Sequence, residues 1–409
     1  MRVLVVDDDA NHAKFVRLLL ERAGHKVEVR NSPLVALADA PGLAPDCMLL
    51  DLMMPEMDGM ELCSKLRGIP SLREAKIIIV SSKAYDSDRH RAMELGADGY
   101  ITKPIDPQLF AHEVERLVSN RITLTYWGVH GTLPVTGRRA LRYGGNTPCI
   151  TVEAPEQPLL IFDAGTGIKS LSDHLTSARP GRITAKLIIS HPHWDHVNTV
   201  PFFAPLYQQG NEVEIMGPRQ GDLSVRQLIS LQMDRIFFPI TIREFGARVD
   251  FRDLREEEFT VGKFTIQTMM LSHPGACLGY RVTYKGRSVC YVTDNEMYPQ
   301  DTAHYNPQYL EKLSEFVSAA DILITDCTFL DEEYPAHVGW GHSCTREVAT
   351  LAARAAVKRL HLFHHDPDQD DDRIDAKLEQ ARKHLAGVNA TAVCDCPAEG
   401  AQFVLASAA

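Results

Sequence analysis

One short string of the chain carries four side chains that bind divalent metals. Residues 191–196 read His-Pro-His-Trp-Asp-His, which puts three imidazoles and a carboxylate within six positions. The string follows an apolar run that predicts a strand. A sharp turn after that strand directs His191 and His193 toward one ion, and Asp195 and His196 toward a second. A single buried histidine is most often a packing residue, but this spacing favours a zinc-type metal site.

A second group of polar residues follows predicted strands near the N-terminus. They are two acids after the first strand, one after the third, a hydroxyl closing the fourth and a lysine after the fifth: Asp7, Asp8, Asp51, Ser81 and Lys103. Open α/β sheets bind ligands at this edge. Clustered carboxylates repel one another, and Mg²⁺ relieves that repulsion. A carboxylate beside such an ion can attack a phosphoryl group. Any one of these acids alone is more often a solvated turn residue, but five such residues in this order along the chain favour a site for phosphoryl transfer.

The first 120 residues alternate short apolar runs with amphipathic stretches. The apolar runs predict strands at 3–6, 27–30, 48–50, 77–80 and 99–101. The amphipathic stretches predict helices at 13–22, 34–38, 60–66, 88–95 and 109–118. Five such units indicate an α/β domain over residues 1–120, with a doubly wound, five-stranded parallel sheet covered on both faces.

The pattern changes at residue 121. Strands are predicted at 122–127, 149–153, 159–163, 187–190, 213–216, 264–271, 279–284, 288–293, 322–326 and 359–363. Helices are predicted at 308–319, 345–355 and 374–385. Strand pairs followed by helix–strand units indicate a second domain over 121–409, a sandwich of sheets flanked by helices. No long linker separates the halves, so we expect direct contact between them.

Composition limits the functions open to the chain. The 409 residues carry 43 basic and 54 acidic side chains, a formal net charge of −11, which disfavours binding to nucleic-acid phosphates. No apolar run approaches the roughly 20 residues of a membrane span. No signal peptide is recognisable. We therefore expect a cytoplasmic protein whose nine cysteines are reduced thiols.

The N-terminal arrangement resembles the receiver domain of two-component response regulators over residues 1–120. The matching strings are Val-Val-Asp7-Asp8-Asp9, Leu-Leu-Asp51-Leu-Met-Met-Pro55-Glu-Met-Asp-Gly59, Val-Ser81-Ser and Gly-Tyr100-Ile-Thr-Lys103-Pro104. The resemblance implies a set of roles: Asp51 accepts phosphate from a sensor histidine kinase, Asp7 and Asp8 bind Mg²⁺ with it, Ser81 and Lys103 bind the phosphoryl group, and Tyr100 moves with Ser81.

The histidine string and later strand ends resemble the metallo-β-lactamase fold, an αββα sandwich, over roughly residues 122–405. The resemblance implies a dinuclear site: His191, His193 and His273 on one metal, Asp195, His196 and His364 on the other, and Asp294 bridging. His365 is the alternative to His364, which we favour as the first residue after its strand. Asp163 is expected to orient a ligand histidine. Zinc fits this set best, and manganese or iron is also tolerated.

One further motif narrows the expected chemistry. Gly339-Trp-Gly341-His342-Ser343 resembles the Gly-His-Ser/Thr segment of a phosphodiesterase branch that includes ribonuclease Z and some cyclic-nucleotide phosphodiesterases. There the histidine assists the departing oxygen, a role that suits imidazole. We therefore assign Asp195 and His342 to catalysis, with a helix cap as the other interpretation of His342. Arg281 fits a phosphate contact and a surface salt bridge equally well.

Together these features predict a response regulator with enzymatic rather than transcriptional output. The expected activity is hydrolysis of a small phosphodiester such as a cyclic nucleotide, because the segment around 219–258 is mixed in charge and lacks a basic arm for RNA. The alternatives are a thioester or lactone hydrolase, an RNA-processing nuclease and an inactive signalling adaptor. Phosphorylation of Asp51 is expected to repack a surface near Tyr100 against the hydrolase or a second subunit, which leaves a homodimer open.

Overall fold

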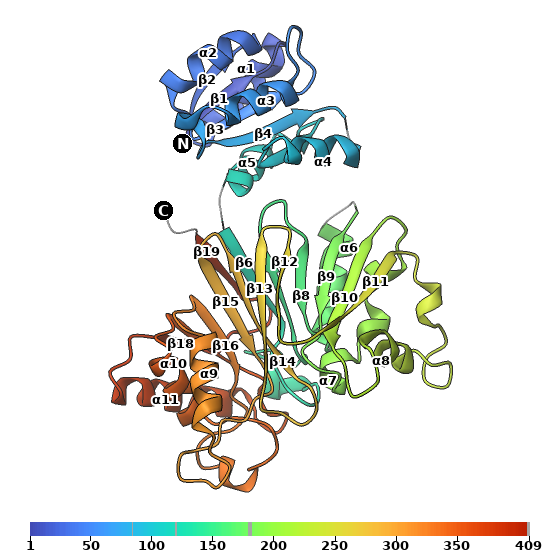
Figure 1. Cartoon of the computed structure of the whole chain (residues 1–409), viewed down its shortest axis with the longest axis vertical. Coiled ribbons are helices and arrows are strands. Elements are labelled where there is room, and N and C mark those ends of the chain that lie inside the picture. The colour runs from blue at the N-terminus through green and yellow to red at the C-terminus, as the bar shows by residue number, and fades with distance from the viewer. Residues whose placement is uncertain (84, 119–120, 179–181, 407–409) are drawn as a thin grey trace. The chain divides into compact units, whose positions relative to one another are not determined.

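The chain folds into two compact units, Met1–Arg121 and Ile122–Ala409, in a computed structural model that describes residues 1–83, 85–118, 121–178 and 182–406. The expected domain boundary at residue 120 lies outside the described residues. Each unit is built around sheets (Figure 1). Within the described ranges, no helix is both long enough and apolar enough to cross a membrane.

The described residues of the first unit form one parallel sheet of five strands in the order β2-β1-β3-β4-β5. Its strands are β1 (Arg2–Val6), β2 (Lys26–Arg30), β3 (Cys47–Asp51), β4 (Lys76–Ser81) and β5 (Gly99–Thr102). Its helices are α1 (Ala10–Arg22), α2 (Pro33–Leu43), α3 (Gly59–Arg67), α4 (Asp86–Glu94) and α5 (Phe110–Val118). The predicted doubly wound fold is confirmed.

Alternation along the strands explains why helices cover both faces of this sheet. Val3 and Val5 of β1 pack with α1 and α5, while Leu4 and Val6 pack with α2, α3 and α4. Both faces of the sheet are therefore buried, and the ends of the strands are left to carry polar groups.

The described residues of the second unit form two mixed sheets of seven strands. The first contains, in spatial order, β11 (Arg248–Leu254), β10 (Glu212–Pro218), β9 (Thr184–Ile188), β8 (Leu159–Phe162), β7 (Cys149–Glu153), β6 (Arg121–Gly128) and β19 (Gln402–Ala406). The second contains β12 (Glu258–Val261), β13 (Phe264–Met270), β14 (Leu278–Tyr284), β15 (Arg287–Val292), β16 (Ile322–Asp326), β17 (Arg359–Phe363) and β18 (Val393–Asp395).

Helices cover the outer face of each sheet, which completes the expected αββα sandwich (Figure 1). The first sheet is covered by α6 (Gly167–Ala178), α7 (Trp194–Val197) and α8 (Val225–Gln232). The second is covered by α9 (Pro307–Phe316), α10 (Thr345–Arg354) and α11 (Asp371–Gly387). Between the sheets, large buried rings fill the core: Tyr126, Phe162, Tyr280, Tyr291 and Phe363.

Several elements differ from the expectation. β9 ends at Ile188, two residues before the predicted end, so Ser190 belongs to the loop that leads into the histidine string. β11 and β19 were not predicted because they are edge strands, in which several residues face solvent and the apolar pattern is weak. The short strands β12 and β18 and the helices α6 and α8 were also not predicted.

Candidate metal centre

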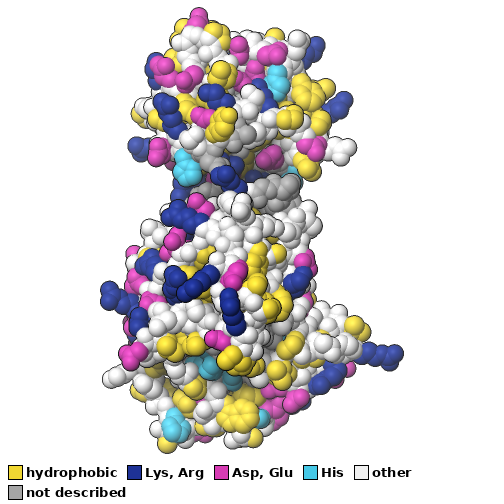
Figure 2. Space-filling model, turned by 90° about the vertical axis from the view of Figure 1, so that its right-hand side faces the viewer, with side chains coloured by type: hydrophobic (Ala, Val, Ile, Leu, Met, Phe, Trp, Pro, Cys, Tyr) yellow, Lys and Arg dark blue, Asp and Glu magenta, His cyan; other side chains and the backbone are white. Residues whose placement is uncertain are grey.

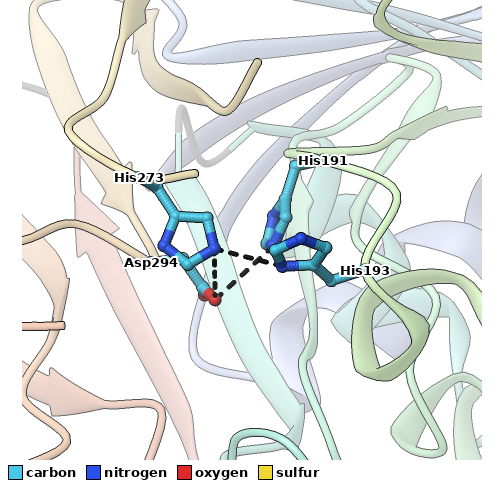
Figure 3. A group of neighbouring side chains, drawn as sticks. All are labelled: His191, His193, His273 and Asp294. Atoms are coloured by element: carbon cyan, nitrogen blue, oxygen red, sulfur yellow. Dashed lines mark hydrogen bonds and ion pairs between the residues drawn. The ribbon is translucent and has the colours of Figure 1, made fainter. Parts of the chain in front are cut away.

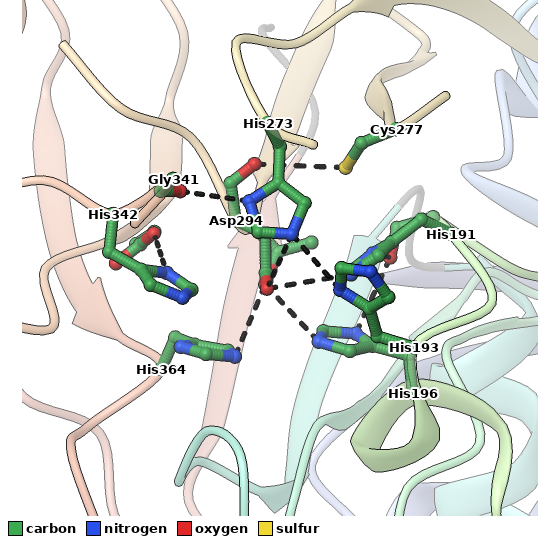
Figure 4. Close-up of polar contacts among 12 residues, drawn as sticks. His191, His193, His196, His273, Cys277, Asp294, Gly341, His342 and His364 are labelled. Carbon is green, nitrogen blue, oxygen red and sulfur yellow. Dashed lines mark hydrogen bonds and ion pairs between the residues drawn. The ribbon is translucent and has the colours of Figure 1, made fainter. Parts of the chain in front are cut away.

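Strand ends from both sheets bring the predicted ligands together. His191 and His193 lie in the loop between β9 and α7, and Asp195 and His196 lie on the single turn of α7. His273 follows β13, while Asp294 and His364 closely follow β15 and β17. The five histidines and Asp294 point into one region at this edge of the sandwich (Figure 4). The carboxylate of Asp195 lies in the same cluster, close to His196, Asp294 and His364.

The first group consists of three histidines and one oxygen of Asp294 (Figure 3). Nε2 of His273 lies 3.1 Å from Nδ1 of His193 and 3.7 Å from Oδ2 of Asp294. Nε2 of His191 lies 3.5 Å from the same oxygen. The ligand atoms of the group all lie within 4.8 Å of one another. Their spacing fits a single metal ion.

The second group uses the other oxygen of Asp294. Oδ1 lies 3.2 Å from Nε2 of His196 and 3.2 Å from Nε2 of His364. Oδ2 of Asp195 lies 3.2 Å and 3.1 Å from the same two nitrogens. Asp294 thus presents one oxygen to each group. Its position fits a carboxylate shared by two ions.

Four of the imidazoles are hydrogen-bonded through Nδ1, the ring nitrogen that faces away from the metal centre. The Nδ1 atoms of four histidines lie 2.8–3.2 Å from protein oxygens, in the pairs His191–Ser190, His196–Asp163, His273–Gly341 and His364–Thr328. A carbonyl oxygen only accepts, so Nδ1 of His273 carries the proton and Nε2 keeps its lone pair. Fixing the outer nitrogen in this way is how proteins orient metal-binding histidines. The residues present therefore fit metal ions.

Electrostatics favour a cation in this cluster. Burial holds the pKa of His191 well below its ordinary value, which keeps that imidazole neutral. Burial opposes ionisation of Asp294 as well, but His364 and His196 hold the pKa of this carboxyl well below its usual range. Burial also lowers the pKa of His196, yet Asp195 and Asp294 raise it well above normal. Two buried carboxylates thus attract positive charge to the centre.

Asp163 lies directly behind the second group. Its side chain is fully buried, and its backbone φ is 60°. Oδ2 lies 2.8 Å from Nδ1 of His196 and accepts hydrogen bonds from Ser190 Oγ and the Tyr291 hydroxyl, both at 2.8 Å. Oδ1 accepts from the backbone N–H of Ser190 at 2.6 Å. The contact between Oδ2 of Asp163 and Nδ1 of His196 is the one that the expected orienting role requires.

His342 lies at the side of the second group. Its Nδ1 lies 2.7 Å from Oδ2 of Asp326, and its ring stacks on His364 with centroids 4.9 Å apart. Burial lowers the pKa of His342, but the Asp326 carboxylate outweighs this and raises it to about 9. The N-cap of α10 is Cys344, so His342 does not cap that helix. Asp326 was not predicted; it is the last residue of the buried strand β16, whereas the predicted ligands lie beyond the ends of their strands.

His365, His361 and Arg281 belong to neither group of proposed ligands. His365 is fully buried next to His130, with ring centroids 5.7 Å apart, and belongs to neither group. His361 is buried with its Nδ1 2.6 Å from the Tyr126 hydroxyl. Arg281 donates hydrogen bonds to the carbonyl oxygens of Phe316 and Ser318, both at 2.9 Å, so its guanidinium has a structural role.

The N-terminal unit has its own polar site at the carboxyl edge of the sheet. Lys103 Nζ lies 3.2 Å from Oδ2 of Asp7 and also forms an ion pair with Asp51. Burial opposes ionisation of Asp7, but His12 and Lys103 lower the pKa of its carboxyl. The contact with His12, at 2.6 Å, was not predicted.

Asp8 and Ser81 lie at the same edge, while Tyr100 lies within β5. Asp8 is exposed beside Asp7, and Ser81 ends β4, where its hydroxyl accepts a hydrogen bond from the N–H of Lys83. Tyr100 is buried, and its hydroxyl donates to the carbonyl oxygen of Lys83 at 2.8 Å. Ser81 and Tyr100 thus hold the same short segment after β4.

Comparisons with known proteins agree with the domain expected for each half of the chain. The response regulator receiver domain family matches residues 3–115, and the beta-lactamase superfamily domain matches residues 160–365, half of the chain. The crystal structure of the metallo-beta-lactamase fold protein YhfI from Bacillus subtilis covers 70% of this chain and 99% of its own, with a TM-score of 0.51 and 19% identity. This last similarity concerns the fold alone.

Curated relatives match about a third of the chain. The transcriptional regulatory protein ResD from Bacillus subtilis is 31% identical over 129 residues, which is 32% of this chain and 52% of ResD. The response regulator PleD from Caulobacter vibrioides is 32% identical over 123 residues, 30% of this chain and 27% of PleD. The match thus spans about half of one relative and about a quarter of the other. The chain belongs to the beta-lactamase superfamily and carries a response regulator receiver domain before its metallo-β-lactamase fold.

Proposed function

We propose that this chain is a response regulator whose output is a dinuclear metal-dependent phosphodiesterase. The observation that carries the proposal is the position of Asp294, whose two oxygens face two separate groups of imidazole nitrogens. His191, His193 and His273 are the proposed ligands of one ion, and Asp195, His196 and His364 those of the other. Zinc suits these nitrogen and oxygen ligands best.

The proposed reaction needs a nucleophile and a protonated leaving group. When bound, two divalent ions neutralise the charge of a phosphodiester and lower the pKa of water, which supplies the nucleophile. His342 donates a proton to the departing alkoxide, because it is held by Asp326 at the side of the second group. Asp163 and Gly341 keep the ligand histidines oriented.

A small phosphodiester such as a cyclic nucleotide is the proposed substrate class. The chain carries a net charge of −11, and a polyanion such as RNA is repelled by an acidic protein. A single phosphodiester group carries one negative charge, which the metal ions offset.

The receiver domain is proposed to regulate this activity through phosphorylation of Asp51 by a sensor histidine kinase. Asp7, Asp8 and Asp51 are the proposed Mg²⁺ ligands, and Ser81 and Lys103 the phosphoryl-binding residues. Tyr100 is the proposed switch, because its hydroxyl and the Ser81 hydroxyl both contact Lys83. Phosphorylation changes activity only if the segment after β4 makes different contacts in the phosphorylated and unphosphorylated states.

Substituting Gly131 by alanine tests the second metal site. A Cβ on Gly131 would lie 2.0 Å from Cε1 of His364 and would displace that imidazole. We expect Gly131→Ala to weaken binding of one of the two ions roughly 10–100-fold, as measured by metal content and calorimetric titration. Gly387→Ala, where a Cβ meets nothing within 4 Å, is the control. Two ions bound with wild-type affinity in Gly131→Ala would contradict the assignment of His364.

The proton-donor role of His342 predicts a dependence on the leaving group. His342→Gln is expected to lower kcat roughly 10²–10⁴-fold for a phosphodiester with an alkyl leaving group, which needs a proton. The same variant should lose little on bis(p-nitrophenyl) phosphate, because p-nitrophenolate departs without one. His304→Gln, at an exposed histidine, is the control. Equal losses on both substrates would refute the role, and turnover of thioesters or lactones instead of phosphodiesters would refute the proposed activity.

Regulation is tested by comparing turnover with and without a small-molecule phosphodonor and Mg²⁺. Wild-type turnover should change roughly fivefold or more on phosphorylation, the usual scale of coupling between sites. Asp51→Asn removes the phosphate acceptor and should show no response to the phosphodonor. Equal rates for phosphorylated and unphosphorylated wild-type protein would eliminate the regulatory proposal.

A further inference from the structure

Residues 339–342 form a short strap against the metal centre, which we call the 339–342 strap. Gly339 and Gly341 have φ angles of 87° and 89°, in the left-handed region that favours glycine. The carbonyl oxygen of Gly341 accepts a hydrogen bond from Nδ1 of His273 at 3.0 Å. A Cβ on Gly341 would lie only 2.3 Å from that nitrogen. The strap therefore rests directly on a proposed metal ligand.

One buried carboxylate fixes the strap. Glu296 accepts hydrogen bonds from the backbone N–H groups of Gly339 and Gly341 at 2.8 and 2.7 Å. The hydroxyl of Tyr334 donates a third hydrogen bond to it at 2.8 Å. Hydrogen bonds to a charged acceptor are among the strong ones. Both neighbours of residue 340 are thus anchored, which fixes the backbone that carries its side chain.

Residue 340, between the two anchored glycines, is a tryptophan. Trp340 is 62% exposed, although tryptophan is on average a largely buried residue. Its ring meets the His337 ring edge-on at a centroid distance of 4.7 Å, and His337 stacks on Phe329 at 4.3 Å. Phe329 in turn lies 6.2 Å from the ring of His342. The indole is therefore supported on one side by rings that lead back to the centre, while much of its surface faces solvent.

A second exposed indole lies next to other proposed ligands. Trp194 stands between His193 and Asp195 at the start of α7 and is 82% exposed. Two of the three tryptophans of the chain are thus exposed near the proposed metal centre. Trp194 is a neighbour of two proposed ligands, and Trp340 is a neighbour of Gly341, which contacts His273. Figure 2 shows histidine and hydrophobic side chains next to one another on one face of the second unit. The protein keeps these aromatic surfaces in water, where they can stack on planar groups.

We propose that Trp340 is a specificity-determining residue that stacks on a planar heterocycle of the substrate, with Trp194 as a second aromatic contact. This inference rests on the proposed phosphodiesterase function and narrows its substrate class to nucleotides, which join a phosphodiester to such a ring. An aromatic side chain can stack on any base, so the site would select nucleotides as a class and not one particular base.

The first test measures binding without turnover. Metal-loaded protein is titrated with thymidine 5′-phosphate and with methyl phosphate, and indole fluorescence and calorimetry are followed. The wild-type protein should bind the nucleotide roughly tenfold more tightly, with quenching of fluorescence. Trp340→Leu should remove most of this preference, and Trp340→Phe should keep part of it. Phe237→Leu, at another exposed aromatic residue, should leave the preference unchanged. Equal binding of the two ligands by the wild-type protein, or an unaltered preference in Trp340→Leu, would overturn the proposal.

The second test uses turnover of two esters with the same leaving group. The ratio of kcat/KM for the p-nitrophenyl ester of thymidine 5′-phosphate to that for methyl p-nitrophenyl phosphate should fall roughly tenfold in Trp340→Leu. An unchanged ratio would overturn the stacking site while leaving the phosphodiesterase intact. No turnover of either ester by the wild-type protein, with the nucleotide preference in binding preserved, would remove the proposed function and support the stacking site.

Discussion

A single buried carboxylate, that of Asp294, faces two groups of imidazoles at once, and the rest of the site is arranged around it. Burying a charge is costly unless the charge is paired and hydrogen-bonded. Here the histidines of both groups surround the carboxylate, and Thr293 donates a hydrogen bond to Oδ1 at 2.7 Å. Every ligand histidine must therefore be held close to this one residue, which requires a rigid support.

The two packed sheets supply that rigidity. Asp294 and His364 follow strands of the second sheet, whereas His191 follows a strand of the first. The aromatic core between the sheets, with Phe162 and Tyr291 among its largest rings, fixes how far apart these strand ends lie. Tyr291 also links core and centre directly, because its hydroxyl donates to Asp163 behind His196.

The sequence was sufficient to predict the fold of both halves and the seven clustered side chains, because motif spacing and strand ends are local features. It was insufficient for contacts between distant loops. The pairing of Asp326 with His342 and the clamp of Glu296 on Gly339 and Gly341 join segments that no local pattern connects. The edge strand β11 was missed for a different reason, since its exposed charged residues hide the alternation on which strand prediction depends.

Anomalous X-ray diffraction from crystals of the zinc-loaded protein tests the dinuclear centre most directly. A dinuclear centre should give two anomalous peaks, one among His191, His193 and His273 and one among Asp195, His196 and His364, with Asp294 contacting both. Their separation should be about 3.5–4 Å, as in other two-metal sites. A single peak, or no peak after soaking in zinc, would contradict a dinuclear centre.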